Sequence, residues 1–164
     1  MKKLRLAAVS AVGALAASAG LMFPATAQAA PTYWQFQNAG FGTCLTAGDT
    51  GTAFATSCVG SNRQQWDWVG ANGNFAELRN RETGTCLMTD NKSSTNAVWM
   101  SSCTGAAGQW WRYAGDSGAI FDNLGAANEG FLRTSHTHNA VYATDLGQQP
   151  EADVSFYVWW GTHD

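Results

Sequence analysis

From residue 33 onward, short apolar stretches alternate with polar turns, and the 3.6-residue periodicity of amphipathic helices is essentially absent. Short strands bounded by Gly, Asn and Asp are typical of an all-β sandwich or barrel. The turn signals lie at residues 38–42, 48–51, 70–74, 83–84, 115–118 and 125–128. This spacing predicts an all-β domain with three or four strands in each third of the region, roughly twelve in total.

The same pattern recurs with a period of about 45 residues, which is typical of units that bury their apolar faces only by packing on each other. Each copy begins with a pair that ends in Leu and closes on an aromatic cluster. The pairs are Cys44-Leu45, Cys86-Leu87 and Phe131-Leu132. Trp66 and Trp111 are 45 positions apart, and Tyr157 follows Trp111 by 46. These distances predict three units, at about 33–75, 76–120 and 121–164.

Residues 1–29 have the composition of a secretory signal peptide. Lys2, Lys3 and Arg5 precede an apolar stretch over 6–23, and 27–29 reads Ala-Gln-Ala, the pattern of a cleavage site. A membrane anchor is the alternative, but serines and glycines dilute the apolar stretch. No later segment approaches the roughly 20 apolar residues that span a bilayer. We therefore expect cleavage after Ala29, a single extracellular domain over 30–164 and no membrane insertion.

Charge excludes one class of partner. Three of the nine basic residues lie in the signal peptide, so six remain against twelve acidic residues, a net charge of −6. No basic patch is available to neutralise phosphates, which argues against nucleic acid and anionic membranes. The low charge content and the abundance of Gly and Trp are common in secreted carbohydrate-binding modules.

The four cysteines lie in the exported region and favour two disulfides. Three pairings are formally available. The repeat selects one of them, because Cys44 and Cys58 occupy the same places in their unit as Cys86 and Cys103 do in theirs. Each bridge would stabilise the fold by about 3 kcal/mol in the chain-entropy model. Zinc is the alternative, but the spacings lack any C-x-x-C pair.

In the third unit, Phe131 and Leu146 stand where the other units have cysteines. We expect these two side chains to face each other and to hold the unit by packing alone.

An alternating strand precedes each second cysteine, and side chains on a strand alternate between its faces. If the alanines point inward, then Phe54, Trp99 and Tyr142 point outward, one in each unit. They are either platforms for stacking sugars or residues covered by the following loops.

The pattern G-x-C-L, a second cysteine and then Q-x-W resembles the ricin B-type lectin family, the trefoil carbohydrate-binding module of secreted glycosidases. Q-x-W is intact at 64–66 and 109–111, and residues 155–157 read Ser-Phe-Tyr at the third place. The resemblance implies a β-trefoil, in which three hairpins cap a six-stranded barrel. It also implies that Trp66, Trp111 and Tyr157 are core scaffold residues and that the partner is a glycan or polysaccharide.

The sequence departs from the family at its sugar-binding positions. Sugar-binding members carry an Asp after the C-L pair, an aromatic residue two places before the second cysteine, and an Asn before the Q-x-W glutamine. These places here hold Thr46, Met88 and Arg133; Thr56, Ser101 and Thr144; and Arg63, Gly108 and Val154. The usual determinants are therefore missing from all three units.

A shifted site is the remaining way to hold a sugar, built on the three outward aromatic residues. Asp49 and Asp90 are candidate carboxylates, although both also suit loop turns, where Asp bonds local backbone. The second unit carries the fullest set, with Asp90, Asn91, Asn96 and Trp99.

No catalytic constellation is evident. His136-x-His138 has a spacing compatible with a metal, but no third ligand is near, so we expect no metal and no cofactor. The predicted function is therefore a secreted, non-catalytic, monomeric β-trefoil that binds carbohydrate through a non-standard site. The alternative is a trefoil that has lost sugar binding and acts on a secreted protein, as an interaction or protease-inhibiting module.

Overall fold

The computed structural model describes residues 32–114, 119–125, 130–136, 139–146 and 153–164, and the predicted signal peptide lies outside them. The all-β prediction is confirmed. The strands are β1 (Trp34–Asn38), β2 (Thr43–Ala47), β3 (Ala53–Ser57), β4 (Trp66–Asn72), β5 (Phe75–Asn80), β6 (Cys86–Thr89), β7 (Thr95–Ser101), β8 (Trp110–Ala114), β9 (Ile120–Asn123), β10 (Gly130–Thr134), β11 (Val141–Thr144) and β12 (Trp159–His163). Three 3-10 turns, η1 (Asn62–Gln64), η2 (Ala107–Gln109) and η3 (Val154–Phe156), precede β4, β8 and β12. Across the described ranges, no helix is long and apolar enough to cross a membrane.

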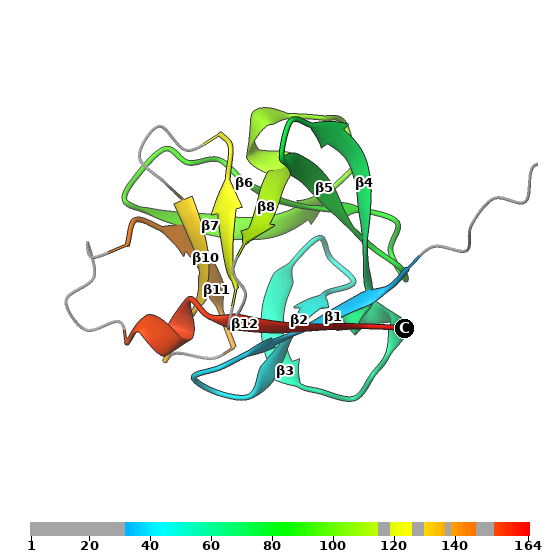
Figure 1. The fold of residues 1–164 in the computed structure, drawn as a ribbon, viewed down its shortest axis with the longest axis vertical. Helices are drawn as coiled ribbons and strands as arrows, with labels where there is room; N and C mark the ends of the chain where they lie inside the picture. The colour runs from blue at the N-terminus through cyan, green and yellow to red at the C-terminus, as the bar shows by residue number, and fades with distance from the viewer. Residues whose placement is uncertain (1–31, 115–118, 126–129, 137–138, 147–152) are drawn as a thin grey trace, which may run out of the picture. The chain divides into compact units, whose positions relative to one another are not determined.

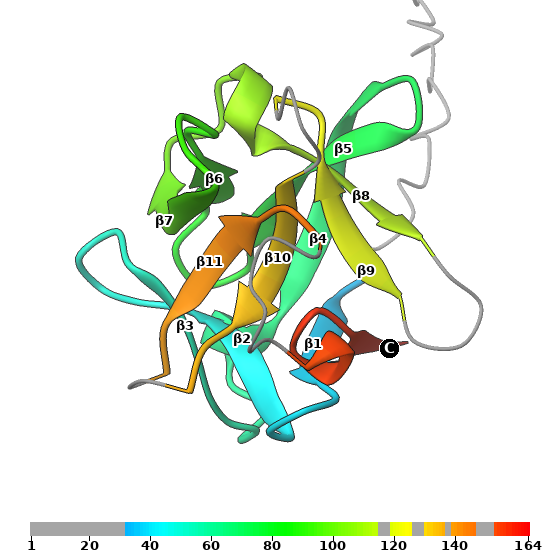
Figure 2. The same cartoon turned by 90° about the vertical axis from the view of Figure 1, so that its left-hand side faces the viewer.

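Six of the strands close into a barrel. Antiparallel pairing runs through β12, β1, β4, β5, β8 and β9 in that order. A bridge between Ala119 and Trp159 joins the two ends of this row. Each third of the domain thus supplies two barrel strands: β1 and β4 in the first unit, β5 and β8 in the second, β9 and β12 in the third (Figure 1 and Figure 2).

The other six strands form three hairpins, β2–β3, β6–β7 and β10–β11. The second strands of the hairpins contact one another around a ring, because β11 pairs with β7 and single bridges join β7 to β3 and β3 to β11. Figure 2 shows β3, β7 and β11 on one side and the barrel strands β5, β8 and β9 on the other. A barrel capped by three hairpins is the β-trefoil that the resemblance implied.

A tryptophan from each unit fills the core and is fixed by one hydrogen bond. The indole N–H donates to the carbonyl of the Leu that follows the first cysteine position. The three bonds run from Trp66 to Leu45, from Trp111 to Leu87 and from Trp159 to Leu132, at 3.1, 2.9 and 3.1 Å. All three tryptophans are fully buried in one cluster.

This pattern corrects the alignment of the third unit, in which Trp159 rather than Tyr157 is the counterpart of Trp66 and Trp111. Tyr157 is buried, but in a smaller cluster with Phe131 and Phe156. It stands where the other units have the Q-x-W glutamine. The Gln64 and Gln109 amides donate to carbonyls at the end of their hairpins, and the Tyr157 hydroxyl reaches the equivalent carbonyl of Asp145 at 3.5 Å. A phenol therefore replaces the amide in the third unit.

Buried asparagines tie the second unit to the first, the third to the second, and the first to the third, and the sequence analysis did not identify them. Asn80 donates its amide to the carbonyls of Arg63 and Gln65 at 2.9 and 3.1 Å. The equivalent bonds run from Asn38 to Phe156 and Val158 at 2.8 and 3.2 Å, and from Asn123 to Gly108 at 2.9 Å. The signal was present in the sequence, because an Asn stands six residues before Cys44 and before Cys86.

We expect Asn80→Ala to lower the free energy of unfolding by about 1–3 kcal/mol, because it leaves buried backbone groups without hydrogen-bond partners. Its Oδ1 also accepts from the N–H groups of Glu82 and Thr83. Urea denaturation measures the loss. The exposed Asn72 provides the matched control, and an equal effect of Asn72→Ala would contradict the role of the tie.

Candidate functional site

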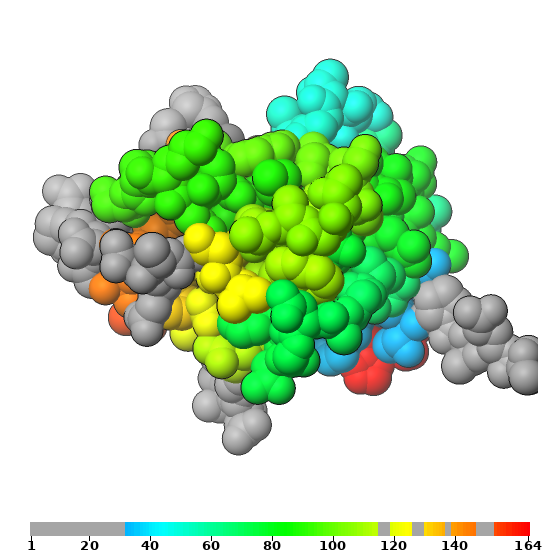
Figure 3. Space-filling model, turned by 90° about the horizontal axis from the view of Figure 1, so that it is seen from above, coloured from blue at the N-terminus to red at the C-terminus, as the bar shows by residue number. Residues whose placement is uncertain are grey.

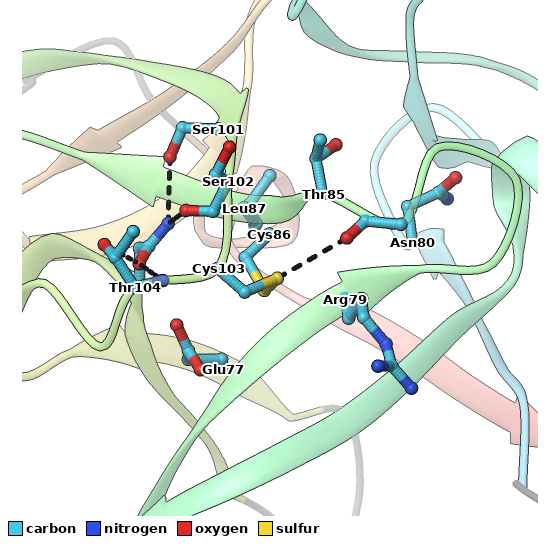
Figure 4. Close-up of a disulfide and its surroundings, with 12 residues drawn as sticks. Glu77, Arg79, Asn80, Thr85, Cys86, Leu87, Ser101, Ser102, Cys103 and Thr104 are labelled. Atoms are coloured by element: carbon cyan, nitrogen blue, oxygen red, sulfur yellow. Dashed lines mark hydrogen bonds between the residues drawn. A yellow bond between two sulfur atoms is a disulfide. The ribbon is translucent and has the colours of Figure 1, made fainter.

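The two predicted disulfides are confirmed, with Cys44 bonded to Cys58 and Cys86 to Cys103. Each joins the start of its hairpin to the segment after it, as Figure 4 shows for the second unit, where Cys103 also contacts the carbonyl of Gly84 at 3.6 Å. The bridges therefore fix the hairpin ends from which the rest of the cap extends.

The third unit is held differently from the way the sequence suggested. Phe131 is buried against Phe156 and Tyr157. Leu146, the expected partner of Phe131, is 45% exposed. Aromatic packing rather than a Phe131–Leu146 pair therefore takes the place of the bridge.

The three outward aromatic residues form a ring on the hairpin cap. Residues that pair directly across antiparallel strands lie on the same face of the sheet. Each aromatic residue is opposite one residue of its own hairpin and one small residue beside or within a neighbouring hairpin. Phe54 is opposite Thr46 and Ala140, Trp99 is opposite Met88 and Thr52, and Tyr142 is opposite Arg133 and Ala97.

All three aromatic residues are half-buried, so each keeps some contact with solvent. The Arg133 guanidinium lies over the Tyr142 ring at 5.2 Å. Phe54 lies close to Gly48, where an added Cβ would be 3.2 Å from its ring. Trp99 makes no ring or cation contact with any residue that the structure describes. Within the described part of the protein, the Trp99 indole therefore has no aromatic or cationic partner that a ligand must displace.

The usual sugar position of the first unit is occupied by an ion pair. Arg63, which replaces the family's Asn, pairs with the carboxylate of Asp49. The same guanidinium donates to the carbonyl of Ala47 at 3.4 Å. Asp49 was predicted as a candidate sugar ligand, and in this structure it is a partner of Arg63.

In the second unit the predicted set does not converge on one point. Asn96 is buried, and its amide bonds the backbone of Ser93 at 2.7 and 2.6 Å. Asp90 pairs with Lys92 at 3.4 Å, and Asn91 donates to Asn123 at 2.7 Å. Two of the four residues are thus engaged within the protein, and Asp90 has an exposed cation beside it.

Close backbone contact also closes this position, because Gly108 lies directly against Thr89. A Cβ on Gly108 would be 1.7 Å from the Thr89 carbonyl oxygen. No side chain fits at the place where the family carries Asn. On the face drawn in Figure 3, the green second unit and the yellow start of the third pack directly against each other.

The third unit places a hydrophobic residue at the same position. With Trp159 as the core tryptophan, this residue is Phe156 and not Val154. Phe156 contacts His136 edge-on at a centroid distance of 4.5 Å and stacks on Phe41 at 4.9 Å. Each unit therefore fills the usual position by a different internal contact.

The fold agrees with that of known proteins. Residues 22–97 match the family described as "Ricin-type beta-trefoil lectin domain-like". The chain is thus similar to ricin-type β-trefoil lectin domains over that segment, and its fold is the β-trefoil. No curated protein is similar to it in sequence.

Solved structures share the trefoil at low identity. The designed threefold-symmetric protein ThreeFoil is 20% identical with a TM-score of 0.66, over 79% of this chain and 97% of its own. The Macrolepiota procera ricin B-like lectin, solved with lactose, is 16% identical with a TM-score of 0.60, over 81% and 94%. The exo-β-1,3-galactanase 1,3Gal43A of Clostridium thermocellum is 15% identical with a TM-score of 0.67, over 83% of this chain and 30% of that enzyme.

The lectin-like domain also has a pocket of about 200 Å³ between its first and third units, which the sequence analysis missed. Its lining includes Phe41, Thr43 and Ala55 from the first unit and Thr134, His136 and Asn139 from the third. These residues are about 80 to 100 positions apart in the sequence, so no local motif indicates that they meet. His138, the second histidine of the H-x-H pair, lies outside the described residues.

Potential metal ligands gather once among the described residues, where Glu77 lies beside Cys86 and Cys103. Both sulfurs are in the disulfide, so neither is a thiolate ligand. Glu77 instead accepts a hydrogen bond from the Gly105 N–H at 2.8 Å. The Glu77 carboxylate therefore holds the loop that follows the Cys86–Cys103 disulfide.

Proposed function

We propose that this chain is a secreted, non-catalytic module that binds extended glycans through the aromatic residues of its hairpin cap. The observation that carries the proposal is the ring of partly exposed Phe54, Trp99 and Tyr142, one from each unit. The lectin fold supports the class of ligand. The predicted signal peptide and the two disulfides support secretion.

Aromatic rings in such positions suit the apolar face of a sugar. Each ring is half-covered by cross-strand neighbours, so little side-chain freedom is lost when a ligand binds. Trp99 has the exposed Thr52 directly across the strand boundary, which places a hydroxyl beside the indole. Because the three units present equivalent rings, one polysaccharide chain that contacts two of them gains avidity without a tight individual site.

We expect Trp99→Ala to weaken binding to a retained polysaccharide by about tenfold, the effect of truncating an aromatic residue that anchors an interface. Affinity electrophoresis and immobilised-glycan titration measure the change. Trp160→Ala is the matched control, since Trp160 is an exposed indole on the barrel strand β12. Unchanged binding by Trp99→Ala would refute the site, and no binding to any glycan would refute the function.

A second function, as a protein-interaction or protease-inhibiting module, is favoured by one observation. The usual sugar positions are filled by Arg63 with Asp49, by Gly108 against Thr89, and by Phe156 with His136. With these three positions filled, the domain would have its exposed surface available for a protein partner. Stoichiometric inhibition across a panel of purified secreted proteases, without binding to any glycan, would establish this function instead.

A further inference from the structure

We propose that the pocket between the first and third units is a separate site for a single neutral sugar ring. The inference rests on the proposed carbohydrate-binding function, but it concerns a different place from the aromatic ring of the cap. The pocket spans two units, whereas each usual family position lies within one unit, and it adjoins the filled position of the third unit through His136 and Phe156.

One wall of the pocket is an aromatic cluster that holds an exposed ring in a fixed orientation. Phe41 stacks on Phe156 with an interplanar angle of 22°, while His136 stands edge-on to both rings at 5.6 and 4.5 Å. Phe156 is buried, yet Phe41 remains 45% exposed. Rigid aromatic side chains with an open face supply contact area at low entropic cost.

The other walls are fixed by hydrogen bonds between the two units. The N–H of Ala55 donates to the carbonyl of Asn139 at 2.7 Å, which joins the first hairpin to the third. The Thr134 hydroxyl donates to Asn38 Oδ1 at 3.2 Å. The pocket is thus formed before any ligand arrives, as is usual for small-molecule sites.

The size and chemistry of the lining select the class of ligand. At about 200 Å³ the pocket is smaller than the roughly 300–1,000 Å³ of sites for drug-sized ligands, so it suits one ring. Among the described residues the lining contains no Lys, Arg, Asp or Glu, so these residues favour a neutral ligand. Phe41 offers an apolar face, while Thr43 and Asn139 add a hydroxyl and an amide. A pyranose has an apolar face and a rim of hydroxyls, which matches this combination.

The test is a titration monitored by NMR, with methyl glycosides of galactose, glucose, mannose and N-acetylglucosamine as probes. We expect at least one of them to shift the backbone amides of Thr43, His136 and Asn139. Phe41→Ala should weaken that binding by about tenfold, and Phe41→Trp should retain it. Leu124→Ala is the matched control, because Leu124 is also a large exposed apolar residue and lies outside the pocket.

The outcomes separate this proposal from the proposed function. If Trp99→Ala abolishes binding of the same monosaccharide and Phe41→Ala does not, the pocket assignment is wrong and the proposed function stands. If none of the probes binds but polysaccharides do, the pocket is again refuted alone. If neither monosaccharides nor polysaccharides bind, both proposals fail. Folding of Phe41→Ala is checked by its amide dispersion, and Phe41→Trp answers the question if Phe41→Ala unfolds.

Discussion

Trp159→Ala is expected to lower the free energy of unfolding by about 3–5 kcal/mol, whereas Trp160→Ala should change it by less than about 0.5 kcal/mol. The two residues are adjacent, yet Trp159 is fully buried and Trp160 is 48% exposed. Trp159 also donates its indole N–H to the Leu132 carbonyl at 3.1 Å. Removing it leaves both a cavity and an unsatisfied buried carbonyl. Natural domains have only about 5–15 kcal/mol of stability, so this single change threatens folding.

Urea denaturation of the two variants, monitored by circular dichroism, measures the difference. The pair controls for residue type, because both changes remove a tryptophan from the same strand. Tyr157→Ala provides a further check on the alignment of the third unit. A larger loss of unfolding free energy in Tyr157→Ala than in Trp159→Ala would support the sequence-based alignment and contradict the structural one.

Replacing either disulfide by a pair of alanines is expected to lower the free energy of unfolding by about 3 kcal/mol. The bridges close loops over sequence separations of 14 and 17 residues, and without them the unfolded chain gains the corresponding conformational entropy. The third hairpin has no bridge, since Phe131 packs on Phe156 and Tyr157 instead. Loss of both bridges should therefore loosen the first two hairpins more than the third.

Hydrogen exchange resolves this effect along the chain. With both disulfides removed, the amides of β2, β3, β6 and β7 should lose more protection than those of β10 and β11. Single replacement of one bridge is the internal control, because the effect should stay in its own unit. Exchange that rises first in the third hairpin would contradict the assigned role of the bridges.

The fold was accessible from the sequence because its repeat carries both the cysteines and the Q-x-W tryptophans in register. The third unit shows where this failed. Its closing tryptophan follows Trp111 by 48 positions and not by 46, and Tyr157 occupies the glutamine position. Because a tyrosine replaces the glutamine of the Q-x-W motif and the spacing differs, neither the motif nor the period identified Trp159 as the core tryptophan. The indole bond to Leu132 decided the assignment.

The candidate site was harder to predict from the sequence. The side chains at the usual sugar-binding positions contact partners that no sequence pattern indicates. Asp49 suggested a ligand carboxylate, but Arg63, 14 residues away, pairs with it. Asn96 suggested an exposed amide, but its own loop engages it. Phe41 lines the pocket but belongs to no sequence motif, because its partners His136 and Phe156 are far along the chain.

The asparagine ties give the three units unequal roles when the chain folds. The Asn80 and Asn123 ties close segments of only 17 and 15 residues, while the Asn38 tie to Phe156 closes 118 residues. Closing the longer loop costs roughly 2 kcal/mol more in entropy for the same chemical contact. The second and third units can therefore join their predecessors as soon as they emerge during synthesis. The first unit, although made earliest, gains its tie only when the last strand arrives, so this tie is expected to form last of the three.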